Sequence, residues 1–361
     1  MKQEIYKPIF LLFSGLVALI LAPFYYLFNI FRKKKVFHED RIKTVLVTEY
    51  HRIGDILMIA PALLALKDRF KNAHIILICS SVAGPLARHL NLVNEVIVFD
   101  APWTNWSFSP LKWIDVFSFA RSLRSKKIDL AIDFKGDIRN SWFIWHLKSE
   151  HSLGFTTAGG EYFFSKSYEF PFDMHQTKRA LHLVSKIGAK FIPNTIKNFV
   201  INNYGYIVIH PGTIDHRRGW PIYHWITLIK SMSCNFNLAI VRTKESQDLV
   251  DFVKKMDLQI YIFEGNIVQF SKWIQKQRIL IAPDSMAGHL ASYFRIPVVS
   301  LFGSQNPELT KPLGGTVVVL NPRTKCFHKR DHWRLCSACM DALDPTLVQN
   351  SVVDLLKHKK K

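Results

Sequence analysis

Short apolar runs, many of them rich in β-branched residues, alternate with helical patterns along most of the chain, and this alternation limits the folds open to it. In the first half, the strand-like runs are Val45–Val47, Ile75–Cys79, Val96–Phe99 and Leu130–Phe134. Segments with the apolar spacing of amphipathic helices separate them, at 56–70, 83–90 and 111–126. Such a strand–helix–strand order predicts a parallel sheet with helices on both faces.

The same alternation starts again in the second half. Its strand-like runs are Tyr206–His210, Leu238–Arg242, Ile260–Phe263, Ile279–Ala282, Val298–Phe302 and Val317–Leu320. Helical patterns lie at about 222–233, 245–256, 268–277, 287–294 and 345–357. The predicted fold class is therefore α/β, with two doubly wound, Rossmann-like domains in series. We expect these domains at 41–200 and 201–361, after a separate N-terminal segment at 1–40.

Residues 149–176 interrupt the pattern. They contain Gly154, Gly159 and Gly160, but no strand is evident immediately before these glycines, as a nucleotide-binding turn requires. We interpret this region as a flexible loop. Because no G-x-G-x-x-G sequence follows a strand in the chain, an oxidoreductase is disfavoured.

A long apolar stretch, residues 9–31, precedes the first domain and is followed by the basic cluster Arg32–Lys35. A helix of this length spans roughly 34 Å, enough for the hydrocarbon core of a bilayer. The basic residues after it favour the inner (cytoplasmic) membrane, with the large C-terminal part of the chain on the cytoplasmic side. A cleaved signal peptide is the alternative, although residues 21–23 do not resemble a cleavage site. Pro23 leaves open whether the segment crosses the membrane or re-enters it.

The composition is strongly basic, with 48 Lys and Arg against 28 Asp and Glu and a formal net charge of +20. Such an excess favours anionic partners, namely nucleic acids, acidic lipid headgroups or phosphorylated substrates. We expect no nucleic-acid partner, because the basic residues cluster at the two ends and in one loop and form no known nucleic-acid-binding module.

Asp55 is the first candidate for chemistry, because it follows the run Val45–Val47 at the start of a helical pattern. Ligands of open α/β sheets bind beyond the carboxyl ends of the strands, and the positive end of a helix dipole keeps a carboxylate ionised. Asp is also a favoured helix N-cap. The residues alone therefore leave open whether Asp55 caps the helix or takes part in a reaction.

A loop in the second half, at 210–221, follows a strand in the same way. Its Gly212 and Thr213, with the neighbouring Arg217 and Arg218, could hold phosphate oxygens through backbone N–H and guanidinium groups. An ordinary solvated basic turn is the alternative interpretation.

The next such loop, at 282–290, contains Asp284 and Ser285, which could bind the hydroxyl groups of a sugar. The N-terminus of the helix that follows could receive a pyrophosphate. Asp284 could equally be the N-cap of that helix, and His289, taken alone, could be a packed core residue.

Four motifs resemble those of glycosyltransferase family 9, the bacterial heptosyltransferases that build the inner core of lipopolysaccharide. They are Arg52-Ile53-Gly54-Asp55 with Pro61-Ala62, Met174-His175 with Arg179, His210-Pro211-Gly212 with Arg218-Gly219-Trp220-Pro221, and Pro283-Asp284-Ser285 with His289-Leu290-Ala291 and Leu301-Phe302-Gly303-Ser304. Their order and spacing, from about residue 42 to the C-terminus, carry the resemblance.

The resemblance implies a GT-B fold, in which two Rossmann-like domains face a cleft. It also implies an inverting, metal-independent transfer from a nucleotide sugar, usually ADP-heptose, with no cofactor. Asp55 would be the general base on the acceptor hydroxyl, with Arg52, Gly54 and His175 on the acceptor side. The donor-side positions are Gly212, Thr213, Arg217, Arg218, Asp284, Ser285, Met286, Ala287, Gly288 and His289. An anionic glycolipid acceptor would suit the membrane segment and the positive charge.

Two residues depart from the family pattern. Met286 stands where the family usually has Gly, and Arg218 stands where it has a phosphate-binding Lys, which changes the geometry of the contact. Another nucleotide sugar therefore stays an alternative donor. A non-catalytic, membrane-tethered protein that binds a nucleotide sugar is an alternative function.

The five cysteines are too few for a disulfide scaffold and fit a reducing compartment. Cys326, Cys336 and Cys339, with His328 and His332, have a spacing that could bind zinc or could simply contain reduced thiols. We expect no metal in the reaction itself, because no D-x-D motif occurs in the chain.

Overall fold

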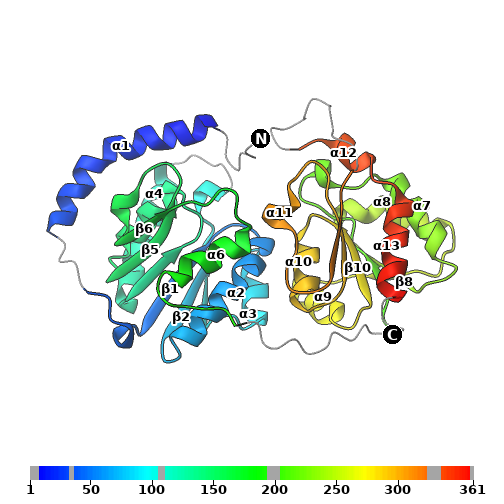
Figure 1. Cartoon of the computed structure of the whole chain (residues 1–361), viewed down its shortest axis with the longest axis horizontal. Coiled ribbons are helices and arrows are strands. Elements are labelled where there is room, and N and C mark those ends of the chain that lie inside the picture. Colours follow the sequence, from blue (N-terminus) through cyan, green and yellow to red (C-terminus); the bar gives the residue numbers. More distant parts are fainter. Residues whose placement is uncertain (1–7, 32–35, 105–109, 193–203, 323–334, 358–361) are drawn as a thin grey trace. The chain divides into compact units, whose positions relative to one another are not determined.

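A computed structural model describes residues 8–31, 36–104, 110–192, 204–322 and 335–357. The chain divides into two compact units, each built around one six-stranded sheet (Figure 1). Unit 1 is Met1–Pro193, and unit 2 is Asn194–Lys361. The predicted α/β class with two doubly wound, Rossmann-like sheets is confirmed.

The sheet of unit 1 has the strand order β3-β2-β1-β4-β5-β6, and all its strands are parallel. The strands are β1 (Thr44–Glu49), β2 (His74–Cys79), β3 (Glu95–Val98), β4 (Leu130–Asp133), β5 (His151–Thr156) and β6 (Lys166–Glu169). The helices are α1 (Pro8–Ile30), α2 (Ile53–Arg69), α3 (Gly84–His89), α4 (Pro110–Ser122), α5 (Ile138–His146) and α6 (Gln176–Ser185). Helix α2 packs against α6, and α4 packs against α5.

The prediction of a flexible loop at 149–176 was wrong, because this region supplies two strands of the sheet, β5 and β6. Their sequences, HSLGFT and KSYE, lack the apolar runs that reveal the other strands. Gly154 lies within β5, where a Cβ atom would lie only 2.3 Å from the ring of Phe164. Glycine is thus required here by close packing in a strand and not by a turn. Gly159 and Gly160 do follow a strand, with φ angles of +90° and +91°.

The sheet of unit 2 has the order β12-β11-β10-β7-β8-β9, again fully parallel. Its strands are β7 (Ile207–Ile209), β8 (Leu238–Val241), β9 (Tyr261–Phe263), β10 (Ile279–Pro283), β11 (Val298–Leu301) and β12 (Val317–Leu320). Its helices are α7 (Ile222–Met232), α8 (Gln247–Lys255), α9 (Ile267–Ile274), α10 (Met286–Tyr293), α11 (Pro307–Thr310), α12 (Ser337–Asp341) and α13 (Pro345–Lys357). The core is formed by apolar strand residues and by helix residues such as Trp225 and Leu228.

Each sheet reverses its strand order at one point, between β1 and β4 in unit 1 and between β7 and β10 in unit 2. The loops that follow the two central strands diverge there and leave room for a ligand at the carboxyl edge of the sheet. The pairing register brings Thr48 of β1 opposite Asp133 of β4, and Ile209 of β7 opposite Ile281 of β10. The residues just beyond these pairs are therefore neighbours in space although they are far apart in sequence.

Among the described residues, one helix is long and apolar enough to cross a membrane, judged by length and composition alone. It is α1, whose segment Ile9–Ile30 has a mean hydropathy of 2.2. This helix corresponds to the apolar stretch at 9–31 noted in the sequence.

Candidate functional site

Asp55 lies at the reversal point of unit 1, in the first turn of α2. The N-cap of α2 is Arg52, so the interpretation of Asp55 as the N-cap was wrong by three positions. Its Oδ2 atom instead accepts a hydrogen bond from the backbone N–H of Arg52, at 3.1 Å, as the acidic member of a capping box does. Capping therefore uses only part of the hydrogen-bonding capacity of this carboxylate.

The other oxygen of Asp55 is held by two side chains from distant parts of unit 1. Lys135, in the loop after β4, donates from Nζ to Oδ1 at 2.7 Å, and Gln176, the first residue of α6, donates from Nε2 to the same oxygen at 2.7 Å. The side chains of Asp55 and Lys135 are 17% and 15% exposed, so the ion pair is largely shielded from water but still accessible. A carboxylate fixed in this way has one immobilised oxygen and one, Oδ2, with room for a further partner.

Electrostatics keep Asp55 ionised. Burial, the largest influence, acts to raise its pKa, but the positive charges of Lys135 and His51 and the hydrogen bonds from Lys135 and Gln176 outweigh it. The pKa of Asp55 is consequently well below its usual value. The group is a carboxylate throughout the physiological pH range, which is the state that a proton acceptor needs.

A second carboxylate, Glu49 at the end of β1, completes the cluster. It is fully buried, and its Oε2 lies 3.3 Å from Lys135 Nζ, while its Oε1 lies 3.0 Å from Nδ1 of His51. Lys135 is thus held between two carboxylates. This arrangement fixes the ammonium group at the edge of the sheet. Moving it away from Asp55 would cost free energy, because buried carboxylates would be left without their counter-charge.

Asp133, the last residue of β4, shapes the loop that carries Lys135. It is fully buried and accepts hydrogen bonds from Thr48 Oγ1, Gly136 N and Asn140 Nδ2, each at 3.0 Å. Burial raises its pKa to about 6 in spite of these donors. Gly136 has a φ angle of +69°, which lets the chain turn tightly after Lys135.

His175, which the sequence assigned to the acceptor side, lies directly before α6. It is the N-cap of α6, and its Nδ1 accepts from the backbone N–H of Thr177 at 3.1 Å. Its neighbour Gln176 reaches Asp55. Sequence reasoning missed Gln176 and Lys135. Lys135 could have been found, because it follows a strand in the same way as the residues that the analysis did select.

The reversal point of unit 2 carries a second pair of opposite charges. Arg218 comes from the loop after β7, Asp284 from the loop after β10, and their Nη1 and Oδ2 atoms are 3.4 Å apart. The amide of Gln305, in its hydrogen-bonding orientation, donates to Asp284 and accepts from Arg218 Nη2 at 3.1 Å. Gln305 follows β11 and was not singled out in the sequence. The side chain of Arg218 is 26% exposed, so its guanidinium group can reach an anion while these contacts orient it.

Arg217, which was also assigned to the donor side, is engaged by its own turn. Its Nε and Nη2 atoms donate to the carboxylate of Asp215 at 2.8 and 2.7 Å. These hydrogen bonds are the main reason why the pKa of Asp215 is well below its usual value. Of the two arginines, Arg218 is therefore the better placed to hold a phosphate.

Further residues of the loop at 210–221 fix its shape. Trp220 is buried against Trp225 and donates from Nε1 to the carbonyl of Leu343 at 3.0 Å. A Cβ atom at Gly212 would lie 2.9 Å from Thr243 Oγ1, so this position requires the absence of a side chain. Thr213 donates from Oγ1 to the carbonyl of Asp215 at 2.9 Å. These contacts fasten both ends of the loop to the rest of unit 2.

The residues around the start of α10 differ in burial and in hydrogen bonding. Ser285 is the N-cap of α10, so the alternative prediction that Asp284 is the N-cap was wrong. The buried Oγ of Ser285 has no hydrogen-bond partner within the described residues. Met286 is half-buried at the first position of the helix. Ala287, Gly288 and His289 are buried. A Cβ atom at Gly288 would meet Pro312, so this glycine serves close packing.

The question of zinc at the C-terminal cysteines involves residues outside the described part of the chain, because Cys326, His328 and His332 lie in 323–334. Cys336 and Cys339 are buried. Within the described residues, no group of three or more His, Cys, Asp and Glu side chains could hold a metal ion.

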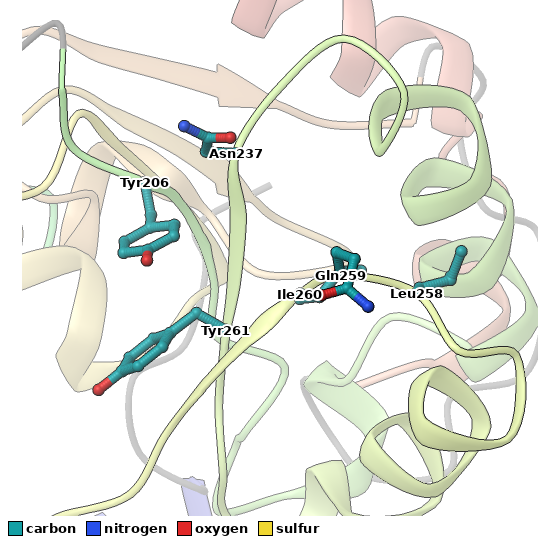
Figure 2. Close-up of a pocket in the computed structure, with 6 residues that line it drawn as sticks. All are labelled: Tyr206, Asn237, Leu258, Gln259, Ile260 and Tyr261. Carbon is teal, nitrogen blue, oxygen red and sulfur yellow. The ribbon is translucent and has the colours of Figure 1, made fainter.

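A hollow of about 390 Å³ lies at the opposite edge of the unit 2 sheet (Figure 2). It is lined by Tyr206, Asn237, Leu258, Gln259, Ile260 and Tyr261, which lie just before or at the start of β7, β8 and β9. The rings of Tyr206 and Tyr261 stack at its side with their centroids 5.2 Å apart. Because ligands bind at the carboxyl ends of the strands in such sheets, this hollow is distinct from the donor loops.

The family model described as glycosyltransferase family 9 (heptosyltransferase) matches residues 116–336, which is more than half of the chain. The chain belongs to glycosyltransferase family 9. The glycosyltransferase class that the motifs indicated is thereby confirmed.

Two named relatives agree with this family. The chain is 22% identical to lipooligosaccharide heptosyltransferase 2 of Campylobacter jejuni over 328 residues, covering 85% of this chain and 93% of the relative. It is 20% identical to lipopolysaccharide heptosyltransferase 1 of Pseudomonas aeruginosa over 225 residues, covering 58% of this chain and 63% of the relative.

Solved structures share the fold of this glycosyltransferase. A family 9 glycosyl transferase from Veillonella parvula has a TM-score of 0.73 at 16% identity and covers 89% of this chain and 99% of that one. E. coli heptosyltransferase WaaC with ADP has a TM-score of 0.68 at 15% identity and covers 86% and 99%. At these identities the likeness establishes the GT-B fold class.

His210, at the head of the loop after β7, makes the stability of this glycosyltransferase depend on pH. Burial lowers the pKa of His210 to about 4, below its usual 6.5. Between pH 6.5 and 4 the unfolded chain binds a proton that the folded chain excludes. The free energy of unfolding is therefore expected to fall as the pH falls, by up to about 1.4 kcal/mol per pH unit from this residue.

Urea unfolding at several pH values checks this expectation. Relative to His210→Gln, the wild type should lose stability between pH 6.5 and 4, whereas His38→Gln, a change at an exposed histidine, should follow the wild type. Parallel curves for the wild type and His210→Gln would contradict the assignment.

Proposed function

We propose that this glycosyltransferase moves a heptose from ADP-heptose to the lipopolysaccharide core or a related phosphorylated glycolipid, with inversion and without a metal ion. The observation that carries the proposal is the ionised Asp55 at the reversal point of unit 1, held by Lys135 and Gln176. The names of the Campylobacter and Pseudomonas relatives support a heptose as the sugar, and that of the E. coli enzyme with ADP supports adenine nucleotide binding.

In this proposal unit 1 binds the acceptor. Oδ2 of Asp55 accepts the proton of the acceptor hydroxyl as its oxygen attacks the anomeric carbon of the donor sugar. The new glycosidic C–O bond forms on one face of the sugar while the bond to the diphosphate breaks on the other, and ADP leaves with the electron pair. Oδ1 stays bound to Lys135 and Gln176, which keeps the carboxylate oriented throughout the step.

Unit 2 binds the donor in this proposal. The exposed part of the Arg218 guanidinium neutralises the diphosphate, while its contacts with Asp284 and Gln305 set its direction. The backbone at Gly212 and Thr213 and the N-terminus of α10 offer further N–H donors. The unpartnered Oγ of Ser285 provides a hydroxyl at the same helix start. Asp284 and His289 are the residues that we assign to the sugar.

The proposed acceptor is consistent with the positive net charge of the chain and with its N-terminal apolar helix. A phosphorylated glycolipid is anionic and resides in a membrane, so both the charge of +20 and the apolar segment at 9–31 suit it. We therefore infer that the enzyme works at the cytoplasmic face of the inner membrane, held there by this segment.

Asp55→Asn tests the assigned base. Because the amide cannot accept the hydroxyl proton, kcat should fall by roughly 10²- to 10⁴-fold, with little change in the affinity for nucleotide. The measurement is initial rate together with calorimetric ADP binding. Asp68→Asn, at an exposed position on the same helix, is the matched control and should keep full activity. Full activity of Asp55→Asn would remove Asp55 from the mechanism.

Lys135→Met tests how Asp55 is kept ionised. Without the ammonium group, the largest of the influences that lower the pKa of Asp55 is lost, so this pKa rises and the carboxylate becomes protonated at a higher pH than in the wild type. The acid limb of the kcat/KM profile should then move to higher pH, and the variant should lose much more activity at pH 6 than at pH 8.

Lys126→Met serves as the control, because Lys126 pairs with Glu95 elsewhere in unit 1. A loss of activity by Lys135→Met that is the same at every pH would indicate a structural role only.

A donor panel tests the sugar and the nucleotide. ADP-heptose is expected to bind to the purified full chain more tightly than UDP-, GDP- and other ADP-sugars, measured by calorimetry. Preference for another nucleotide sugar would leave the fold and the base in place but replace the donor, an outcome for which the half-buried Met286 at the start of α10 offers a reason.

A further inference from the structure

Helix α1 has two faces of different character. Its inner residues, which are buried or half-buried, include small and polar side chains and recur at helical spacing, namely Leu11, Ser14, Gly15, Val17, Ala18, Leu21, Ala22, Tyr25 and Asn29. Its outer residues are large and apolar, with exposures between 44% and 75% for Ile9, Phe10, Leu12, Phe13, Leu16, Leu19, Ile20, Phe24, Leu27, Phe28 and Ile30. The less hydrophobic face of the helix therefore packs against unit 1, and its apolar face points away from the protein.

The inner face is joined to unit 1 by specific contacts along its length. The hydroxyl of Tyr162 donates to the carbonyl of Ala18 at 2.8 Å in a buried hydrogen bond. Asn29 donates from Nδ2 to the carbonyl of Tyr162 at 2.6 Å and accepts from Trp145 Nε1 at 3.2 Å. The ring of Tyr25 packs edge-on against Trp145, with the centroids 4.8 Å apart. Figure 1 shows α1, in blue, running alongside unit 1.

These contacts exclude a helix that crosses the bilayer while unit 1 keeps them. Ala18 lies near the middle of the 23-residue helix, so a crossing helix would carry it to the centre of the hydrocarbon core. The irregular segment around Gly159, where a Cβ atom would lie 2.6 Å from Ala18 Cβ, would have to follow it there. Irregular backbone exposed to lipid does not occur at that depth.

A second helix of unit 1 also carries exposed apolar side chains. On α4, Leu111 and Ile114 are 72% and 63% exposed, one helical turn apart. Ring contacts connect this helix to α1, because Phe117 of α4 contacts His146 at 5.0 Å, His146 contacts Trp145 at 4.9 Å, and Trp145 contacts Phe28 of α1 at 6.3 Å. Unit 1 thus has large exposed apolar side chains on α4 as well as on α1.

We propose that α1 lies in the plane of the membrane interface, with its outer face and the exposed residues of α4 inserted among the lipids of an anionic bilayer. The basic cluster Arg32–Lys35, which follows α1 in the sequence, supplies the charge that is complementary to such lipids. Helices that lie in an interface have this division between an apolar face and a face turned to the polar side. The inference goes beyond the proposed reaction and holds for any donor or acceptor.

Crosslinking in isolated membranes tests the orientation of α1. A Cβ atom at Gly15 would lie 3.8 Å from the carbonyl oxygen of Ala158, so the pair Gly15→Cys with Ala158→Cys should be joined by a short bis-maleimide. The control pair Leu19→Cys with Ala158→Cys uses a residue that is 70% exposed on the outer face and should not be joined. Mass spectrometry of the peptides scores both pairs. Absence of the first crosslink in membranes, with its formation in detergent, would show that α1 leaves unit 1 to cross the bilayer.

Vesicle flotation of the purified full chain tests the occupant of the outer face. The double variant Leu12→Glu with Leu19→Glu should bind vesicles containing phosphatidylglycerol at least about tenfold more weakly than the wild type. Leu64→Glu, at an exposed apolar position on α2, is the matched control and should bind normally. Unchanged vesicle binding by the double variant, together with a smaller mass in light scattering, would overturn the proposal and assign the face to a second copy of the chain.

Discussion

The ion pair between Asp55 and Lys135 keeps the carboxyl group of Asp55 in its ionised form. A carboxyl group as sheltered as Asp55 would favour its neutral form if it stood alone, because burial acts against the charge. Lys135 reverses this preference, and it can do so only because the strand order makes β1 and β4 neighbours. The topology of the sheet is therefore a precondition for the ionised state of the group.

Unit 2 repeats this arrangement with the charges exchanged. In unit 1 the acid, Asp55, follows the first strand and the cation, Lys135, follows the fourth. In unit 2 the cation, Arg218, follows the first strand and the acid, Asp284, follows the fourth. In both units a glutamine amide, Gln176 or Gln305, donates to the acid. The exchange leaves a carboxylate oxygen available in one unit and a guanidinium in the other, which suits a proton acceptor and an anion binder respectively.

The elements that could be predicted from the sequence are those with a clear apolar run or a clear helical periodicity of their own. Strands such as Ile279–Pro283 are continuous apolar runs, and helix α13 has clear periodicity from Pro345 to Lys357. Strands β5 and β6 escaped prediction because each contains polar residues, and in β5 a glycine is required by the ring of a distant Phe164. Local propensity carries no information about such a partner.

The site was predictable to the same extent. Asp55, Asp284 and Lys135 each follow a strand and can be found in that way. Their contacts cannot, because Lys135 and Gln176 reach Asp55 from positions 80 and 121 residues away. The engagement of Arg217 by Asp215 depends on the conformation of one turn and was equally invisible in the residue pattern. Sequence reasoning located the edge of each sheet where chemistry can occur, and the fold determined which side chains meet there.

The inward face of α1 has a consequence for any shortened form of this enzyme. Tyr162 is only 4% exposed, and it is covered in part by the rings and the backbone of α1. Removing the residues before 36 would take away one apolar surface and expose another, which consists of Tyr162, Trp142 and Trp145. The hydrogen bonds that these three side chains make with α1 would be lost. The helix is thus a part of the folded unit as well as the membrane attachment that we propose, and solubility gained by its removal would be offset by newly exposed aromatic rings.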